Sequence, residues 1–462
     1  MENTGKYPEV FVAAITDQCD LLYAPLHNFS ALVNRGAARQ LREILSTGQH
    51  PSSTAIQPIM EPLSKPAHTL PAIRTGPINK PFFIGLIPTR GCNLACRYCD
   101  FPAPGQDGIV MDLALIRNAV EAYLDLLLAH GHRQGEIHFF GGEPFHARAA
   151  VEAAVGYASL RASELGISLR FEATTNGVYN EFFCDWIADH FDAVVLSMDG
   201  PADIQNRHRP ARKGLSHFSV VERSAKIFSE GPTELVIRAC VTKETAPRMK
   251  EIARWMASEF RPAMICFEPL NPTANAEAAG LVPPDPWEFA RNFHEAACLL
   301  DDKGIEVVYS SATLNEIRNS FCPVGRDALI VSPEGELSAC YLIPSDWESK
   351  GLDLKIGYVS DKGFNFDPRA VQRVRQLAGR EKPLCVNCLC QYHCAGGCHV
   401  NHTTDQGPYD DSCIQTRIIT ITKLLDGLSQ PALASLWLND RPQLETTIRQ
   451  KTDRLLSPEL PL

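Results

Sequence analysis

The stretch RGCNLACRYCD, residues 90–100, contains three cysteines, Cys92, Cys96 and Cys99, which are separated by three and by two residues. It follows the apolar run 82–87, which is typical of a buried strand. A closed zinc or iron–sulfur site usually has four protein ligands, so three thiolates leave one coordination position open. Zinc-binding cysteines usually come as two C-x2-C or C-x4-C pairs, and no fourth ligand lies nearby. The stretch therefore favours a catalytic iron–sulfur site over a zinc knuckle or three unrelated thiols.

The composition favours a cytoplasmic enzyme of two or three domains. The chain has 462 residues, of which 45% are hydrophobic and 21% charged, and its net charge is −10. The negative charge argues against a nucleic-acid partner, and no apolar run is long enough to span a membrane. The N-terminus lacks the basic start and the apolar stretch of a signal peptide. Sixteen cysteines without an export signal indicate reduced, metal-binding thiols rather than disulfides.

Alternating strands and helices begin at residue 82. Buried strands are predicted at 82–87, 136–140, 168–173, 193–198, 234–241, 264–267 and 306–309, with helices between them. The first of these helices is predicted to start at the cap Asp112 and to bury an apolar face that includes Ile116 and Leu124. Such alternation implies parallel strands with right-handed crossovers, which fits an α/β fold built on an open, partial (β/α)6 barrel. Active-site groups should then lie on the loops that follow the strands.

The chain divides into five regions. They are a small N-terminal α+β unit (1–50), a proline-rich linker (51–81), the barrel (82–315), a cysteine-rich region (316–413) and C-terminal helices (414–462). In the first region, strands are predicted at 11–14 and 21–24 and a helix at 35–45. The linker has seven prolines and is predicted to be extended. The last region is predicted to be helical because Ile414, Ile418 and Ile421 share one apolar face.

The cysteine stretch resembles that of the radical S-adenosylmethionine (SAM) enzymes. The resemblance implies that Cys92, Cys96 and Cys99 hold a [4Fe–4S] cluster whose fourth iron binds the amino and carboxylate groups of SAM. It also implies that Tyr98 packs against the adenine and that the fold is the TIM-like partial barrel of that family. One electron from such a cluster cleaves the sulfonium to give a 5′-deoxyadenosyl radical, while the protein orients the cofactor and excludes water.

A glycine-rich turn after the second predicted strand resembles the family's contact with the SAM amino group. Its residues are Gly141, Gly142, Glu143 and Pro144. Two glycines allow a backbone to approach a ligand closely, and Glu143 offers an acceptor for an ammonium group. Asn176 follows the third strand in a Thr-Asn-Gly sequence and is either a ligand contact or part of a turn.

Ser197 and Arg209, which follow the fourth predicted strand, resemble a pair found in peptide-modifying members of the family. There, a serine and an arginine twelve positions later bind the SAM carboxylate. A guanidinium is suited to a two-pronged contact with a carboxylate. The alternative is a surface loop with solvated arginines.

Seven late cysteines match, spacing for spacing, the SPASM domain that follows many radical SAM barrels. They are Cys322, Cys340, Cys385, Cys388, Cys394, Cys398 and Cys413. The resemblance implies two auxiliary [4Fe–4S] clusters, so that with the SAM-binding cluster the implied total is three. One is held by Cys385, Cys388, Cys394 and Cys413, and the other by Cys322, Cys340 and Cys398. A single zinc ion would leave several of these thiols without a metal.

The three-cysteine auxiliary set is one thiolate short of the four that a cube needs. Cys390 or Cys298 could complete it. Alternatively, the position stays open and binds a thiolate or a peptide of the substrate. The sequence leaves both alternatives open.

Family members with this pair of domains mostly oxidise a residue in a peptide or protein. The leading hypothesis is therefore a radical SAM oxidoreductase that abstracts a hydrogen from a ribosomally made precursor peptide and forms a cross-link or a dehydrogenated residue. Its partners would be that peptide and an external electron donor such as flavodoxin or ferredoxin. The N-terminal unit could dock a leader peptide on a strand edge or simply extend the cover of the barrel.

Three other functions compete with this hypothesis. An anaerobic sulfatase maturase, which forms formylglycine, would be expected to have an aspartate base directly after the second auxiliary cysteine, where this chain has Tyr341. Tyr341 could itself titrate or form a hydrogen bond. The others are a radical SAM dehydrogenase or epimerase of a small molecule, and a non-enzymatic iron–sulfur redox protein. In the last case Glu143, Ser197 and Arg209 would have no ligand to bind.

Overall fold

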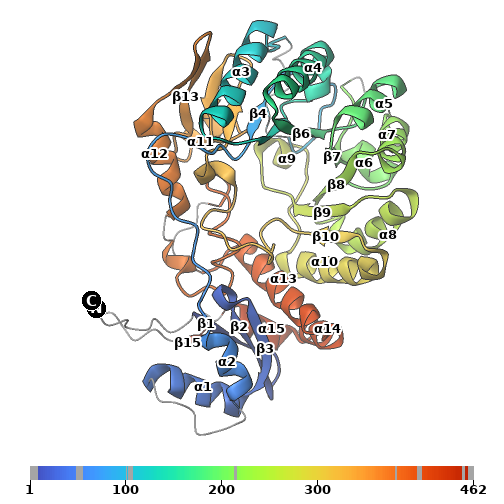
Figure 1. The fold of residues 1–462 in the computed structure, drawn as a ribbon. Coiled ribbons are helices and arrows are strands. Elements are labelled where there is room, and N and C mark those ends of the chain that lie inside the picture. Colours follow the sequence, from blue (N-terminus) through green and yellow to red (C-terminus); the bar gives the residue numbers. More distant parts are fainter. Residues whose placement is uncertain are drawn as a thin grey trace.

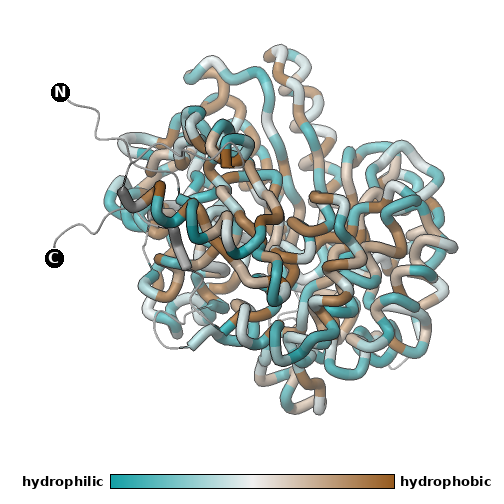
Figure 2. The backbone as a smooth tube through the Cα atoms, turned by 90° about the horizontal axis from the view of Figure 1, so that it is seen from below, coloured by the Kyte–Doolittle hydropathy of each residue, from teal (hydrophilic) through white to brown (hydrophobic). Residues whose placement is uncertain are grey.

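The computed structural model describes residues 9–47, 56–99, 101, 108–212, 216–379, 382–402, 408–449 and 453–455. Within them it shows an open α/β barrel, a cysteine-rich region beside its mouth and a small unit to which strands from near both ends of the chain contribute (Figure 1). None of the helices in these residues is long and apolar enough to cross a membrane. Hydrophilic segments run along many of the outer loops, and hydrophobic ones run through the interior (Figure 2).

The barrel is a row of parallel strands in chain order, as the alternation predicted. They are β4 (Ile84–Leu86), β5 (Gln134–Phe139), β6 (Ser168–Thr175), β7 (Ala193–Ser197), β8 (Glu234–Val241), β9 (Met264–Pro269) and β10 (Glu306–Val308). Each pairs with the next in parallel. The carboxyl ends of these strands therefore face the same side, and the loops that follow them gather there.

Helices cover the outside of this row (Figure 1). They are α3 (Leu113–Ala129), α4 (Arg148–Leu165), α5 (Glu181–His190), α6 (Ala202–His208), α7 (Phe218–Glu230), α8 (Met249–Glu259) and α10 (Pro286–Leu300). The short α9 (Ala274–Ala278) instead lies beside the cysteine loop, where Asn275 donates to the Cys99 carbonyl at 2.7 Å. The predicted start of α3 is confirmed, since Asp112 accepts a hydrogen bond from the Leu115 backbone N–H at 2.7 Å. Ile116 and Leu124 are buried on its inner face, as the spacing predicted.

The sheet does not end with the barrel. Strand β11 (Leu329–Val331) pairs in parallel with β4, and β12 (Glu336–Ser338), β13 (Lys355–Ser360) and β14 (Gly363–Phe366) continue antiparallel to give eleven strands. The sequence analysis ended the barrel at residue 315 and did not predict that the sheet continues. Strands β11, β12 and β14 have only three or four residues each, so they leave almost no periodic signal. Helices α11 (Pro344–Glu348) and α12 (Pro368–Gln376) complete this part. The cysteine-rich region is thus built directly onto the edge of the barrel.

The N-terminal unit is a four-stranded antiparallel sheet in the order β15-β1-β2-β3. Its strands are β1 (Val10–Ala14), β2 (Cys19–Ala24), β3 (Phe29–Asn34) and β15 (Asp453–Leu455). The sequence predicted β1 and β2 but missed β3 and β15. Alternate residues of β1 face opposite sides, since Phe11 belongs to the core shared with the barrel, whereas Val12 packs toward α1 (Arg35–Thr47). Both faces of this sheet are therefore covered.

Two expectations for the chain segments around this unit need correction. The segment 51–81 is not simply extended, because it contains helix α2 (Gln57–Ser64), which begins with a proline at its first turn and buries Ile59 and Leu63 against the N-terminal core. The tail is helical as predicted in α13 (Asp411–Gly427), α14 (Pro431–Asn439) and α15 (Arg441–Arg449), but it ends in β15. Strands from near the two ends of the chain thus form one sheet.

Candidate functional site

The cysteine loop is seated on the glycine-rich turn that follows β5. A side chain added at Gly142 would lie 2.3 Å from the carbonyl oxygen of Gly91, and one at Gly141, whose φ is +144°, would lie 2.5 Å from the carbonyl oxygen of Thr89. The backbone N–H of Glu143 also donates to the Gly91 carbonyl at 2.9 Å. Glycine is needed here because two backbone segments touch. The turn therefore supports the cysteine loop, a role that the sequence did not predict.

The loop is also fastened to the segment that follows α6. The backbone N–H of Arg97 donates to the His208 carbonyl at 2.9 Å, and that of Ala95 donates to the Pro210 carbonyl at 2.8 Å. From the same segment, Arg212 Nε donates to the Cys92 carbonyl at 2.7 Å. Two loops after different strands thus hold the cysteines in place.

The thiols of Cys92, Cys96 and Cys99 lie close enough to affect one another's protonation. Burial raises the pKa of Cys92 to about 11 and that of Cys96 to about 12, and the negative charge of neighbouring thiolates adds to both increases. The charge of Arg209 opposes the increase at Cys96. A bound metal would replace these protons, because the thiolate is the ligand form. A donor set of three clustered thiols fits an iron–sulfur cluster with one open position.

Glu143 is 1% exposed, and its carboxylate accepts three hydrogen bonds. Thr175 Oγ1 donates to it at 2.7 Å, the Asn176 backbone N–H at 2.7 Å and the Phe145 backbone N–H at 3.2 Å. Burial nevertheless raises the pKa of Glu143 to about 7, since three neutral donors do not fully replace water. A cationic ligand would stabilise the charged form, so the site fits an ammonium group. Pro144, which begins a 3₁₀ turn, is buried behind this carboxylate.

Asn176 links the third strand to the cysteine loop. Its Nδ2 donates to Asn93 Oδ1 at 2.7 Å and lies 3.7 Å from Cys92 Sγ, while its Oδ1 accepts from the Val178 backbone N–H at 2.9 Å. Asn93 in turn donates to the Val178 carbonyl at 2.7 Å. The structure therefore shows the turn at Asn176 and places its amide beside Cys92, while the ligand contact of Asn176 stays a prediction.

Asp199 is the residue that sequence reasoning missed. It is 1% exposed and accepts hydrogen bonds from Tyr98 Oη at 2.6 Å, Arg209 Nη2 at 3.1 Å, His208 Nδ1 at 3.3 Å and the Cys240 backbone N–H at 2.9 Å. Burial opposes its ionisation, but the charge of Arg209 and the hydrogen bond from His208 hold the pKa of Asp199 well below its usual range. An aspartate in a strand-to-helix turn is an ordinary capping signal, so nothing in the sequence marks this one as buried.

Asp199 orients Arg209 and leaves part of its guanidinium available. Arg209 lies over the ring of Tyr98, 5.3 Å from its centroid. Its Nε is buried and has no hydrogen-bond partner among the described residues. A buried donor without a partner costs free energy, so a bound carboxylate fits this position. Ser197 is the last residue of β7 and stands at the same end of the sheet.

The predicted four-cysteine set comes together beside helix α13. Burial raises the pKa of Cys394 to about 12, with further contributions from the charges of Cys388 and Cys385. Burial also raises the pKa of Cys413, to which the charges of Cys388 and Cys394 contribute. The buried Arg417 of α13 donates to Cys388 Sγ at 3.2 Å. Four clustered thiols with a cationic donor fit an iron–sulfur cube.

The predicted three-cysteine set also comes together, without either extra cysteine. Burial raises the pKa of Cys322 to about 12 and that of Cys340 to about 11, and the charge of Cys398 contributes to both. Cys390 instead lies beside Cys388, whose pKa is lowered by a hydrogen bond from the Cys390 thiol. Cys298 lies on α10 with His294, 3.5 Å from its Nε2. The structure thus favours the alternative in which this set keeps an open position.

Tyr341 lies among aromatic rings on the barrel side of the cysteine-rich region. Its ring stacks on Phe83 at a centroid distance of 6.2 Å and packs on Phe140 at 4.7 Å. Burial, aided by the negative charge of Glu172, raises the pKa of Tyr341 well above its ordinary value. Tyr341 therefore stays protonated near neutral pH and can donate a hydrogen bond, but it is unsuited to act as a general base.

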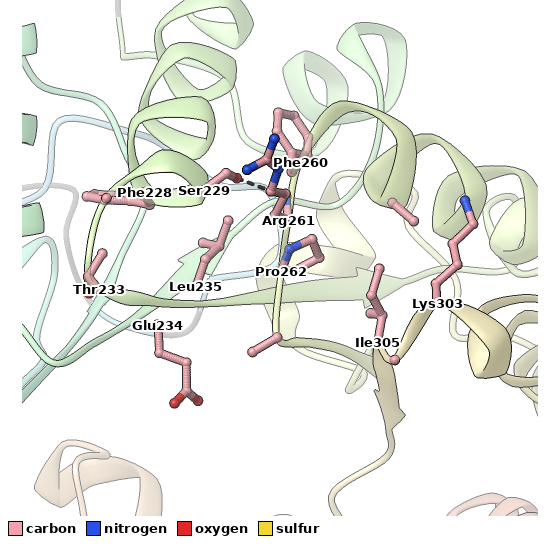
Figure 3. Close-up of a pocket in the computed structure, with 14 residues that line it drawn as sticks. Phe228, Ser229, Thr233, Glu234, Leu235, Phe260, Arg261, Pro262, Lys303 and Ile305 are labelled. Carbon is pink, nitrogen blue, oxygen red and sulfur yellow. Dashed lines mark hydrogen bonds between the residues drawn. The ribbon is translucent and has the colours of Figure 1, made fainter.

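Two cavities lie at opposite ends of the strands. One of about 460 Å³ lies at the amino ends of β8 to β10, where Figure 3 shows Glu234, Leu235, Pro262 and Ile305 around it. The other, of about 240 Å³, lies at the carboxyl ends. Barrel residues such as Arg238 and Glu268 line it together with Cys394, Cys398 and Cys413. Because the strands are parallel, only the second of these two cavities opens on the side of the cysteine loop.

Part of the barrel matches a known family of domains. Residues 86–256 match the model of the radical SAM superfamily. The cysteine-type anaerobic sulfatase-maturating enzyme of Clostridium perfringens (strain ATCC 13124) is 24% identical over 324 residues, which cover 67% of this chain and 86% of that protein. The serine-type anaerobic sulfatase-maturating enzyme of Klebsiella aerogenes is 25% identical over 342 residues, which cover 70% and 81%.

Solved structures show the same fold. Native anSMEcpe with bound AdoMet superposes with a TM-score of 0.59 at 19% identity, covering 77% of this chain and 99% of that one. Streptococcus suis SuiB superposes with a TM-score of 0.51 at 13% identity, covering 85% and 95%. The chain therefore contains a radical SAM domain of α/β fold, followed by a cysteine-rich C-terminal region consistent with a SPASM domain.

Proposed function

We propose that this protein is a radical SAM enzyme that oxidises a residue in a peptide or protein substrate. The observation that carries the proposal is the buried Nε of Arg209, which has no hydrogen-bond partner among the described residues, while the charge of Arg209 is close enough to Cys96 to oppose the increase in that thiol's pKa. A buried cationic donor beside a three-thiol site has no purpose in a closed redox centre. It is suited to a carboxylate-bearing ligand that binds there.

The roles of the residues follow from their contacts. When bound, the cluster and SAM supply a carbon-centred radical. Cys92, Cys96 and Cys99 would hold the cluster, and Glu143 would bind the SAM amino group because its buried carboxylate gains from a positive partner. Arg209, oriented by Asp199, and Ser197 would bind the SAM carboxylate. Tyr98 would flank the adenine, since its ring lies beneath Arg209 and packs against the apolar cluster around Leu270.

The two auxiliary sets would hold two further [4Fe–4S] clusters, which gives three in total. Cys385, Cys388, Cys394 and Cys413 would form a closed cube. Cys322, Cys340 and Cys398 would leave one iron open, since Cys390 and Cys298 lie elsewhere. Cys398 borders the cavity at the carboxyl ends of β8 and β9, so a substrate group can reach that open position. An external donor such as a flavodoxin or ferredoxin would supply the electrons.

A peptide substrate is favoured by the named relatives and by the fold. Two of the relatives mature sulfatases, and anSMEcpe has been solved with bound AdoMet and the Cp18Cys peptide. The N-terminal sheet offers a means of docking such a chain. Strand β3 lies at one edge of that sheet, opposite β15, and an edge strand can pair with an extended peptide.

Sulfatase maturation is the second candidate, because the curated relatives carry that name. The position after the second auxiliary cysteine argues against it. Tyr341 there is buried among aromatic rings with a raised pKa, so it cannot replace an aspartate as a base. We therefore place modification of a different peptide ahead of formylglycine formation.

Anaerobic reduction of the reconstituted protein in the presence of SAM tests the core of the proposal. The expected product is 5′-deoxyadenosine, detected by chromatography, at an iron content of about twelve atoms per chain. Cys184→Ala is a matched control, since this buried thiol lies on α5 and should leave the product unchanged. If the wild type forms no 5′-deoxyadenosine, only the non-enzymatic redox function is left.

The substrate is tested by offering peptides encoded beside the gene and a sulfatase-derived peptide. Loss of two hydrogens from a precursor peptide, measured by mass spectrometry, supports the leading function. Formylglycine in the sulfatase peptide would reverse the order of the two candidates. Conversion of a sugar or an amine, with no change in any peptide, would indicate a small-molecule enzyme.

A further inference from the structure

A fourth group of metal-ligating side chains lies outside the three cysteine sets described above. His294 and Cys298 are four residues apart on α10, so they project from the same face of that helix. Asp426 comes from α13, which packs against α10 on the outside of the barrel (Figure 1). One ligand atom from each of the three residues lies within 4.8 Å of the other two.

The distances between the three ligand atoms are close to those between neighbouring ligands of a tetrahedral metal ion. Cys298 Sγ lies 3.8 Å from His294 Nδ1, and Asp426 Oδ2 lies 3.3 Å from the same nitrogen. Neighbouring ligands of tetrahedral zinc are about 3.3–3.6 Å apart, given bonds of about 2.0–2.3 Å. Small side-chain adjustments would therefore bring the three atoms into one coordination sphere.

Burial and hydrogen bonding around the group also favour a ligand. His294 is 3% exposed, whereas Cys298 is exposed and leaves a path from solvent. Asp426 Oδ1 is buried and has no hydrogen-bond partner among the described residues. Lys423 lies one turn earlier on α13 and brings a positive charge that would oppose a bound cation. Its ammonium group lies 5.9 Å from the Phe293 ring centroid. A thiolate and a carboxylate together offset the two charges of a divalent cation, and Lys423 adds one further positive charge nearby.

We propose that His294, Cys298 and Asp426 bind one zinc ion, which clamps helix α10 of the barrel to helix α13. The mixed sulfur, nitrogen and oxygen donor set suits zinc rather than magnesium or calcium, and a water molecule would complete four-coordination. Cys413, a member of the four-cysteine set, lies on the same helix as Asp426. The ion would thus fasten the helix that carries an auxiliary thiol to the wall of the barrel.

The test uses iron-replete protein, so that the cluster cysteines are already occupied. We expect one zinc per chain after incubation with zinc and desalting, with one sulfur neighbour in X-ray absorption at the zinc edge. Cys298→Ser and Asp426→Asn should each weaken zinc binding by about tenfold or more in a chelator competition. Both residues are at least partly exposed, so these variants should fold. Cys19→Ser, in the N-terminal sheet, is the matched thiol control and should bind zinc like the wild type.

Thermal unfolding tests the clamp separately. Zinc should raise the unfolding midpoint of the wild type and of Cys19→Ser but not that of Cys298→Ser. Equal zinc content in the wild type and in Cys298→Ser would overturn the site. So would three or four sulfur neighbours, because the ion would then sit at cluster cysteines. One bound zinc with an unchanged midpoint would overturn the clamp.

Discussion

The cysteine loop 92–99 and the cysteine block 385–413 use the same side chain in different surroundings. The loop has three thiols and is held by backbone contacts from two other loops, at residues 141–143 and 208–212. The block supplies the four thiols of the closed auxiliary set, and it is held by its own turns and by helix α13, whose Arg417 donates to Cys388. The loop depends on distant parts of the chain, and the block mainly on its neighbours. We infer that an open, reactive site needs external support, whereas a closed one can be built locally.

The largest expected effect separates the two regions directly. Cys96→Ala should reduce 5′-deoxyadenosine formation to background, because it removes a ligand of the SAM-binding cluster. Cys388→Ala should retain SAM cleavage and lose peptide turnover, because its thiol belongs to the block. Both are measured by chromatography of anaerobic reactions. Loss of SAM cleavage in Cys388→Ala, with iron still bound at the loop, would show that the regions are not independent.

A substitution outside the cysteines can remove the contacts that support the cysteine loop. Gly142→Ala should destabilise the protein by about 1–3 kcal/mol and lower its loop iron, because the new methyl group would overlap the Gly91 carbonyl. Urea unfolding and iron analysis measure both effects. Gly156→Ala is the control: no atom lies within 4 Å of the added carbon, and it is expected to stabilise α4 by about 0.5–1 kcal/mol. Equal behaviour of the two variants would refute the steric argument.

The electrostatic support of the loop centres on Asp199. Asp199→Asn should weaken SAM binding about 10–100-fold, the equivalent of one charge-assisted hydrogen bond of about 1.5–3 kcal/mol. The reason is that Arg209 would lose the carboxylate that orients it. Calorimetric titration of the reconstituted enzyme measures the affinity. Asp203→Asn, which removes an exposed carboxylate paired with Arg248, should leave it nearly unchanged.

The smallest effect is a pH dependence at Glu143. Its pKa is raised to about 7, so SAM affinity should fall by about tenfold per pH unit below 7 and level off above it. In the ligand-free protein, the stability depends on pH with the opposite sign. The raised pKa favours the protonated folded form, so this group's contribution to stability should decrease as pH rises from about 4.5 to about 7. Glu143→Gln should remove both dependences. A pH-independent affinity in the wild type would contradict the role of Glu143.

The order of strands, the thiols and the surrounding motifs could be read from the sequence because their signals are local. A buried strand followed by a capped helix repeats through the barrel. The spacing of the cysteines can be recognised directly, because it depends only on their positions along the chain. Strands β3, β11 and β15 could not be predicted. β11 and β15 have only three residues each, and they form because β4 and β1 offer free edges. Helix α2 was hidden by its prolines, because Pro58 stands in its first turn, where proline is tolerated, whereas Pro62 lies inside it.

By itself, the sequence determined which ligands the protein offers: three thiols in one loop, seven in the cysteine-rich region after the barrel, and a carboxylate and a guanidinium on loops that follow two barrel strands. Only the tertiary structure decided how they are used. It buried Asp199 beneath Arg209, placed Gly142 against the cysteine loop and put Cys390 beside Cys388 rather than with Cys322. The physical reason is that burial and contact between distant segments set protonation and orientation, and neither is encoded at a single position.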